Sequence, residues 1–414
     1  MKNMFKSYKG LPREIYILFI GKIVNSLGAF VHPLMSLILT QKLGMTAGEA
    51  GGFVTILAVC QVPCIIIGGK LTDTIGRKKV ITIFQLLGAA MLILCGIMPL
   101  SVNTAKVMIL SSCFYSLSSP AYDALNADLT NESNRKSAYS LLYMGVNIGF
   151  SVGPILGGFL YKDYLPLVFI GDAITTLIAL LLIVLYIKEQ NKSFEKTSMV
   201  VENDEYEQEK NMSTFSVLIE RPILVLFPLM MLLYQFAYSQ WGFALPLQLG
   251  GLFNENGAKL YGFLGGFNGL IVIIFTPLLT YKTRKYKTLN VMSLGGMLYG
   301  LSFIIYAISN YKILFFIATL ALTIGEVLTA INGQAFIANN TPASHRGRVS
   351  SIVPMISGAG YALGPMIMGK IIDSNGMFIS WMIITCVCFI GAIGMLLIKN
   401  IKNVNDVYAN ESNI

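Results

Sequence analysis

The chain has 414 residues, of which 55% are hydrophobic and only 12% are charged. Soluble globular domains carry about 25% charged residues, so this composition excludes an ordinary soluble protein and predicts a helical membrane protein with many spans. The formal net charge of +9 does not indicate nucleic-acid binding, because the Lys and Arg residues are spread over loops and no soluble domain presents them.

Apolar stretches of about 20 residues, each long enough to cross a bilayer, follow one another along the chain. They predict an all-α membrane protein with 12 transmembrane helices. The basic and polar start leads directly into the first stretch, so we expect no cleavable signal peptide. The predicted spans are residues 15–39, 47–69, 80–100, 105–127, 138–160, 165–187, 222–247, 258–281, 288–309, 312–338, 348–371 and 377–398.

The Lys and Arg residues fall mainly on one side of these spans. If the N-terminus is inside, the inner segments hold 23 of the 30 cations and the outer segments hold six. Cytoplasmic loops are enriched in Lys and Arg, so both termini are predicted to be cytoplasmic. The Lys- and Ile-rich composition, without a targeting signal, favours a multi-pass protein of a bacterial plasma membrane, the inner or cytoplasmic membrane.

The loop between the second and third spans contains the run GKLTDTIGRKK, from Gly69 to Lys79. Its glycines allow two helix ends and a tight turn to approach closely. Asp73 can lie against a helix N-terminus or a cation, and the basic run marks the cytoplasmic surface. This run resembles the loop between helices 2 and 3 of the major facilitator superfamily. The resemblance implies a transporter rather than an enzyme.

The resemblance also implies a gate on the cytoplasmic side. In the superfamily an acid at the inner end of span 4, here Asp128, pairs with the loop arginine, here Arg77, and Asp73 sits by the end of span 11. Such pairs would hold the cytoplasmic side closed in the outward-open state and break when it opens. The residues expected to act in this gate are Gly69, Asp73, Gly76, Arg77, Lys78, Asp128 and Arg135.

The fifth span is rich in glycine. Small residues four apart let helices pack backbone to backbone, and this row resembles the glycine-proline motif of the 12-span drug:proton antiporters of the superfamily. The alternative is a plain packing face, because the eleventh span carries a weaker copy of the row. The residues predicted to pack helices here are Gly149, Gly153, Pro154 and Gly157.

The chain repeats internally, since Arg135, Gly149 and Pro154 recur 211 residues later as Arg346, Gly360 and Pro365. Duplicated halves are typical of facilitator-type transporters, whose substrate site lies near the midplane where the halves meet. The predicted domains are an N-terminal six-helix bundle over residues 1–187, a cytoplasmic linker over 188–221, and a C-terminal six-helix bundle with a short cytoplasmic tail over 222–414.

The resemblance implies that spans 1, 4, 7 and 10 line the central cavity. These spans carry aromatic side chains at helical spacing together with sparse polar groups. Such a lining suits an amphipathic or cationic ligand through stacking and cation–π contacts, whereas the alternative is that the aromatics pack between helices. The predicted lining residues are Asn25, Tyr115, Ser119, Tyr122, Tyr234, Tyr238, Trp241 and Asn332.

Few ionisable residues lie inside the predicted spans, and such residues are functional candidates. Glu326 is about 21 Å into span 10 at 1.5 Å per residue, near the midplane. Its context resembles the span 10 acid of some multidrug facilitators, so we expect proton coupling, the alternative being a static acid bonded to Tyr or Asn neighbours. Asp123 is a second proton-coupling candidate, and it can pair with Lys22. Lys22 can equally extend its ammonium group towards the membrane surface, which would be a plain structural role. Asp172 is expected to be structural.

No nucleotide-binding glycine loop, zinc ligand set or nucleophile elbow is visible, so the sequence predicts no enzyme and no cofactor or metal. We expect a monomeric secondary transporter, driven by the proton gradient, that exports amphipathic or cationic drug-like compounds by rocker-switch alternating access. Its partners would be a small-molecule substrate, protons and the lipid bilayer. The alternatives are a proton-coupled transporter of a specific metabolite, peptide, sugar or lipid, and a non-transporting membrane sensor or scaffold.

Overall fold

The computed structural model describes residues 8–187, 222–283, 285–340 and 346–398. Within these ranges all regular secondary structure is helical, and ten segments are long and apolar enough to cross a membrane. The prediction of an all-helical protein with many membrane spans is therefore confirmed.

Two places account for the difference between these ten segments and the predicted number of spans. Helix α5 (Val102–Asp128) is long enough to cross a membrane but falls outside the ten, and it is rich in Ser, Asn, Asp and Tyr. Helix α15 (Arg346–Ile398) contains a single continuous segment, Met355–Ile398, although its backbone is non-helical at Gly376, where φ is 77°.

The chain forms two compact units. Residues 242–273 belong to unit 1 with the N-terminal helices, and the predicted boundary at 188–221 lies outside the described residues. Unit 1 holds α1 (Arg13–Leu27), α2 (Val31–Leu37), the π-helical turn η2 (Ile38–Lys42), α3 (Ala47–Ile75), α4 (Arg77–Ile97), α5, α6 (Glu132–Asp163), α7 (Leu165–Tyr186), α11 (Ala244–Phe253) and the first part of α12 (Glu255–Thr283). Unit 2 holds the rest of α12 with α10 (Ile223–Gly242), α13 (Thr288–Ile308), α14 (Lys312–Asn340) and α15.

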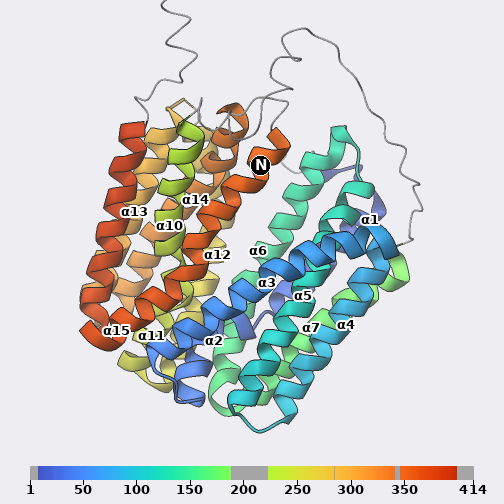
Figure 1. Ribbon diagram of the computed structural model, residues 1–414, viewed down its shortest axis with the longest axis horizontal. Coiled ribbons are helices and arrows are strands. Elements are labelled where there is room, and N and C mark those ends of the chain that lie inside the picture. Colours follow the sequence, from blue (N-terminus) through green and yellow to red (C-terminus); the bar gives the residue numbers. More distant parts are fainter. Residues whose placement is uncertain (1–7, 188–221, 284, 341–345, 399–414) are drawn as a thin grey trace, which may run out of the picture. The chain divides into compact units, whose positions relative to one another are not determined.

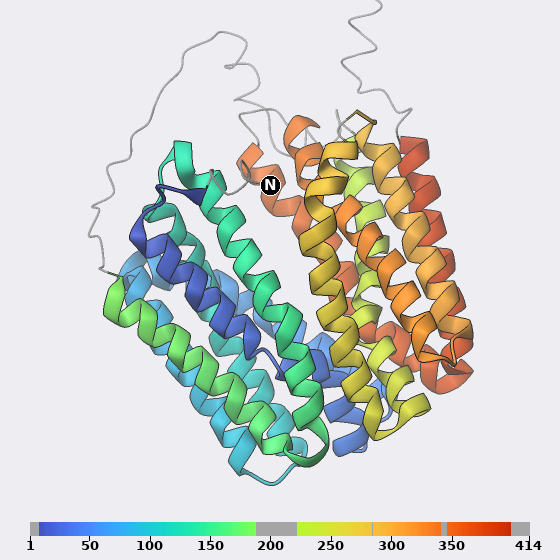
Figure 2. The ribbon, with the colours of Figure 1, turned by 180° about the vertical axis from the view of Figure 1, so that it is seen from behind.

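Unit 1 is built on two groups of neighbouring helices. Helix α1 lies against α6 and α7, and α4 lies against α5 and α7 (Figures 1 and 2). Apolar side chains from these helices, such as Ile15, Val80 and Ile183, are buried between them. The outward faces are apolar too, since Ile66 is 61% and Leu185 63% exposed. Large exposed aliphatic side chains on long helices are expected where the neighbour is lipid rather than water.

Unit 2 packs around aromatic rings. Helix α13 lies against α14 and α15. The fully buried ring of Trp381 stacks on Phe303 with centroids 5.5 Å apart, and the hydroxyl of Tyr306 lies 2.9 Å from Oγ1 of Thr319. Buried tyrosines thus keep their polar ends bonded inside the bundle, as an apolar environment requires.

The two units share one packing rule at equivalent glycines. In unit 1, a Cβ on Gly149 of α6 would lie 2.5 Å from the carbonyl oxygen of Ile23 on α1. In unit 2, a Cβ on Gly360 of α15 would collide with the carbonyl oxygen of Leu232 on α10. The repeat predicted from the sequence therefore corresponds to the same close helix–helix contact made twice.

The first predicted span is interrupted. The sequence predicts one helix over 15–39, whereas the structure ends α1 at Leu27 and restarts the helix at Val31. The amide of Val31 donates to Oδ2 of Asp172 on α7 at 3.2 Å. An unpaired backbone group within a bilayer costs several kcal/mol, so this carboxylate makes the break tolerable. Asp172 thus has the structural role expected for it.

We predict that Asp172→Ala lowers the stability of the protein, because the amide of Val31 loses its acceptor. The expected cost is about 1–3 kcal/mol, the penalty for a buried unsatisfied donor. Asp172→Asn keeps an acceptor oxygen at the same place and should cost less. Thermal unfolding in detergent measures both, with the exposed Asp163→Asn on α6 as the control. Equal midpoints for Asp172→Ala and the control would contradict this role.

Candidate functional site

A single residue makes the turn between α3 and α4. Gly76 has φ 96° and ψ 153°, a conformation that residues with a Cβ rarely adopt. Because the turn is so short, Arg77 becomes the first residue of α4 and stands at the helix end. Gly69 lies about two turns earlier in α3, and a Cβ added there would meet no neighbouring atom within 4 Å.

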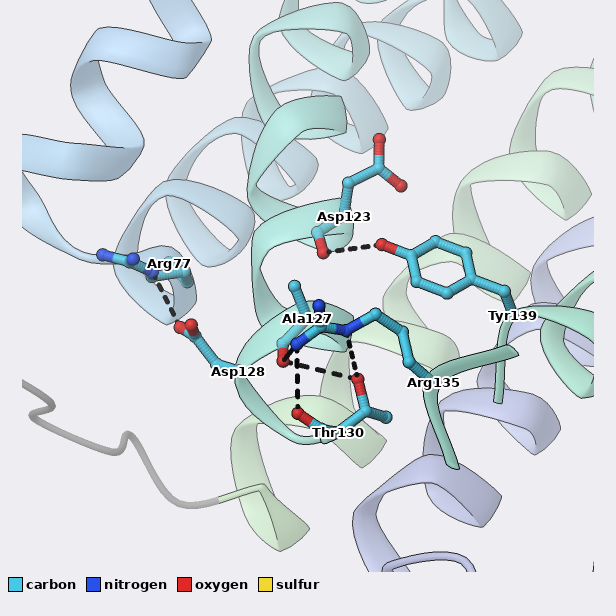
Figure 3. Close-up of polar contacts among 7 residues, drawn as sticks. All are labelled: Arg77, Asp123, Ala127, Asp128, Thr130, Arg135 and Tyr139. Carbon is cyan, nitrogen blue, oxygen red and sulfur yellow. Dashed lines mark hydrogen bonds and ion pairs between the residues drawn. The ribbon is translucent and has the colours of Figure 1, made fainter. Parts of the chain in front are cut away.

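Arg77 forms an ion pair with the end of α5. Its Nε lies 3.0 Å from Oδ2 of Asp128, and the two side chains are 22% and 31% exposed (Figure 3). The pair joins the first turn of α4 to the last residue of α5. The contact that the resemblance implies is thus present, and its role in gating stays a prediction.

The neighbouring basic residues bind helix ends. Nζ of Lys78 donates to the carbonyl oxygens of Val184 and Ile187, each at 2.8 Å. These carbonyls close α7, so Lys78 acts as a cationic cap at the negative end of that helix. Asp73, in contrast, is exposed on α3.

Arg135 binds the C-terminal end of α5 from α6. Its guanidinium donates to the hydroxyl and the carbonyl oxygen of Thr130, each at 3.4 Å, and to the carbonyl oxygen of Ala127 at 3.5 Å (Figure 3). These long bonds satisfy carbonyls that the helix itself leaves open. Its repeat counterpart, Arg346, has a side chain outside the described ones.

Asp123 lies on α5 but apart from these contacts. Its carboxyl group is directed away from Arg77 and Arg135, while its backbone carbonyl accepts a hydrogen bond from Tyr139 at 3.4 Å (Figure 3). The side chain instead lines a cavity of about 180 Å³ inside unit 1, together with Lys22.

This cavity gathers the residues that the sequence predicted on spans 1 and 4. Its lining also includes Gln85 of span 3, a span that was not expected to face a cavity, and Ser118 of span 4, which the sequence analysis did not name beside Ser119. The signal was present, since Gln85 is an amide inside an apolar span, and its Nε2 donates to Oγ of Ser118 at 2.7 Å. The predicted residues on its wall are Asn25, Tyr115, Ser119, Tyr122 and Asp123.

The glycine-proline row of α6 packs against two helices of unit 1. A Cβ on Gly153 would lie 2.7 Å from the carbonyl oxygen of Ser26 on α1, and one on Gly157 would lie 3.3 Å from Phe30. On α12, a Cβ on Gly265 would meet Pro154 at 3.2 Å. The row is therefore a packing face, and its part in antiport stays a prediction.

Unit 2 surrounds Glu326 with tyrosines. Glu326 lies near the middle of α14, and the hydroxyl of Tyr238 on α10 is hydrogen-bonded to its carboxyl group. Tyr299 of α13 and Tyr361 of α15 also interact electrostatically with this carboxyl group. The sequence analysis found Tyr238 but missed Tyr299 and Tyr361, because they lie on helices that were not expected to line a cavity.

The other residues predicted on spans 7 and 10 make local contacts. Tyr234 is buried, and its hydroxyl donates to the carbonyl oxygen of Met292 at 3.1 Å. Trp241 is only 9% exposed. On α14, Nδ2 of Asn332 donates to the carbonyl oxygen of Leu328 at 2.7 Å. For Tyr234 the structure favours packing between helices, the alternative already considered for these aromatics.

The sequence profile of the Major Facilitator Superfamily matches residues 18–306 and 286–409. The match covers nearly the whole chain, so the chain belongs to this superfamily. It is a membrane transporter of small molecules and not an enzyme.

Several characterised and uncharacterised transporters are similar over most of their length. The MFS-type transporter YttB of Bacillus subtilis is 25% identical, over 89% of this chain and 90% of its own. A Na(+), Li(+), K(+)/H(+) antiporter of Planococcus maritimus is 22% identical over 90% and 96%. Multidrug resistance protein 1 of Bacillus subtilis is 22% identical over 88% and 89%.

Solved structures agree in fold. The peptide transporter POT in complex with sulfate matches with a TM-score of 0.75 at 15% identity, over 95% of both chains. The nucleoside transporter NupG matches with a TM-score of 0.72 at 15% identity, over 94% of this chain and 100% of its own. At these identities the likeness establishes the fold alone.

We predict that Lys78→Met destabilises unit 1, because two carbonyls at the end of α7 lose a charged donor. Hydrogen bonds to charged groups contribute about 1.5–3 kcal/mol, and partial exposure of Lys78 places the effect at the lower end. The matched control is Lys79→Met, since Lys79 is exposed one residue further on. The unfolding midpoint in detergent should fall for Lys78→Met alone, and equal midpoints would refute the capping role.

Proposed function

We propose that this transporter couples proton movement to the export of amphipathic or cationic drug-like compounds. In this proposal it works by rocker-switch alternating access, and Glu326 carries the proton. The proton gradient supplies the driving force, so no cofactor is needed. Glu326 cannot bind a proton and a cation at the same time. Binding of the cation would therefore displace the proton, which is the exchange that antiport requires.

The arrangement around Glu326 is the observation that carries this proposal. A carboxyl group midway along a membrane helix is costly unless it is bonded, and here one tyrosine hydroxyl binds it while two further tyrosines stand near. The hydroxyl of Tyr299 also lies 3.3 Å from Oγ1 of Thr329, one turn along α14. Aromatic faces next to one carboxylate attract organic cations through cation–π contacts and through charge.

The names of two relatives support the same class of mechanism. One is called a cation/proton antiporter and one a multidrug resistance protein, and both align with most of this chain. Their identity of 22% leaves the substrate of this chain open, so these names support the class of mechanism only.

We further propose 12 membrane spans with both termini in the cytoplasm of a bacterium and the protein in its plasma membrane as a monomer. The number follows if α5 crosses the bilayer and if α15 crosses it twice, bending at Gly376. A 53-residue helix would be about 80 Å long at 1.5 Å per residue, far more than one bilayer crossing needs.

In the proposed cycle the Arg77–Asp128 pair helps to hold the cytoplasmic gate, with Gly69, Asp73 and Gly76 shaping the loop. The pair is only partly exposed, and it joins helix ends that would separate when the gate opens. A partly exposed ion pair contributes about 0.5–1 kcal/mol, which is enough to bias two states two- to fivefold.

We therefore predict that Asp128→Asn lowers the transport rate in proteoliposomes about two- to fivefold. The charge-exchanged double variant, Arg77→Asp with Asp128→Arg, restores the attraction and should recover more than half of the lost rate. A double variant no better than either single change would show that the pair does not act through its charge.

A second candidate is transport of a defined metabolite on the same fold. The observation that favours it is the cavity of unit 1, which Lys22 and Asp123 line together, since a wall with groups of both signs suits a substrate with defined polar groups of its own. The fold neighbours that transport peptides and nucleosides show only that this architecture accommodates such cargo.

Substrate-driven proton movement in proteoliposomes tests the leading proposal. For wild type, we expect proton release when several unrelated organic cations are added, and we expect at least a tenfold loss for Glu326→Gln. Tyr238→Phe keeps the ring and removes the hydrogen bond to the carboxyl group, so it should shift the pH dependence of transport without abolishing it.

The control is Asp163→Asn, an exposed acid at the end of α6. No response of wild type to any cation would refute drug export. Drug transport that survives in Glu326→Gln would keep the function and move the proton site, with Asp123 next to be tested.

A further inference from the structure

Unit 1 contains a small cavity that carries both a positive and a negative charge. It has a volume of about 180 Å³, and Lys22 of α1 and Asp123 of α5 line it. The rest of its wall mixes amides and hydroxyls with the apolar side chains of Leu18, Ala179 and Ile183. A binding site with a few polar groups on an apolar wall is typical of small-molecule recognition.

The two charges are neighbours without forming a direct ion pair in the described structure. Nζ of Lys22 lies 4.7 Å from the centroid of the Tyr122 ring, and Asp123 acts on it from a distance. The pair leaves the cavity neutral overall. For a cation alone the attraction to Asp123 is offset by repulsion from Lys22, and for an anion alone the reverse holds, whereas a group bearing both charges can place each charge beside its opposite.

A second cavity adjoins the first. It has a volume of about 280 Å³, and the two cavities share the side chains of Asn25, Gln85 and Tyr115. The second cavity's remaining wall combines six apolar side chains with five polar ones. The apolar ones are Ala29, Val31, Met35, Leu57, Leu92 and Met108, and the polar ones are His32, Ser111, Ser112, Thr176 and Asp172, whose carboxylate already accepts the amide of Val31. Each cavity is smaller than the roughly 300–1,000 Å³ of a drug-sized pocket, so a charged head fits one and an apolar body the other.

The shared wall carries a buried hydroxyl group, that of Tyr115. The hydroxyl groups of Thr176 and Ser111 lie beside it. Its ring is held in place by Gly88 of α4, where a Cβ would lie 2.5 Å from the ring. A hydroxyl fixed at the junction of two cavities is a suitable partner for a ligand, because a hydroxyl group can both donate and accept hydrogen bonds.

We propose that these adjoining cavities bind a zwitterionic head group with an attached apolar body, such as an amino acid with a hydrophobic side chain. Asp123 receives the ammonium group, Lys22 receives the carboxylate, and the apolar body enters the second cavity. The proposal rests on the proposed transport function only in treating this ligand as cargo, and it adds zwitterionic amphiphiles to the cationic compounds proposed above.

Binding of three matched probes to the full-length protein in detergent tests the proposal. Phenylalanine carries both charges, 2-phenylethylamine lacks the carboxylate, and 3-phenylpropanoate lacks the ammonium group. By isothermal titration, wild type should bind phenylalanine at least tenfold more tightly than either other probe. Equal binding of phenylalanine and 2-phenylethylamine, or no binding of any probe, would overturn the proposal.

Two variants test which side chain binds which charged group of the ligand. Lys22→Gln should abolish the preference for phenylalanine over 2-phenylethylamine, and Asp123→Asn should abolish the preference over 3-phenylpropanoate. The exposed Lys106→Gln on α5 is the matched control and should keep both preferences. If either cavity variant fails to fold, the comparison of the three probes on wild type still decides the question.

The same experiment separates this inference from the proposed antiport. Binding is measured without a proton gradient, and Glu326→Gln lies in unit 2, so that variant should keep the phenylalanine preference. Retained preference with failed drug-driven proton release would refute antiport alone. Proton release with drugs but no preference among the probes would refute the zwitterion site alone.

Discussion

A chain within a bilayer must satisfy every backbone hydrogen bond from its own groups, because hydrocarbon offers none. Long helices meet this demand along most of the described chain. The break between α1 and α2 does not, and there the carboxylate of Asp172 accepts the bond of Val31 from a different helix. An acidic residue in a membrane span thus has an architectural role here.

Close backbone contact decides which helices neighbour one another. Apolar side chains gain little by leaving lipid for protein, so packing depends on small residues that let helices approach. Gly149 places α6 on α1, and Gly360 places α15 on α10 in the same way. The helices so positioned carry Lys22 in one unit and Tyr238 in the other. The repeated glycines therefore support the surroundings of both candidate sites without touching a ligand.

The charged residues fall into two classes by their surroundings. At the helix ends, Arg77, Lys78 and Arg135 bind a carboxylate or terminal carbonyls of a neighbouring helix. These contacts join helix ends, and the side chains of Arg77 and Asp128 are partly exposed. Deeper in the bundles, Lys22 and Glu326 lie beside tyrosine rings or hydroxyls. Charges in that setting interact strongly with each other and with a ligand, because little water screens them.

The sequence alone determined the class of protein and part of each site. Apolar length predicted membrane helices, the loop run showed the resemblance to the superfamily, and that resemblance implied that Arg77 meets Asp128. These features are local, or belong to a run of residues that recurs across a family. The depth of Glu326 also follows from the sequence, because the rise of a helix is fixed.

Only the tertiary structure decided which side chains meet across helices. Tyr299 and Tyr361 reach Glu326 from α13 and α15, and helical periodicity does not say which face of those helices turns towards α14. The break before Val31 depends on an acceptor 141 residues away in the sequence. Periodicity fixes the faces of one helix, but the choice of neighbours comes from the packing of all helices together, which no single stretch of sequence contains.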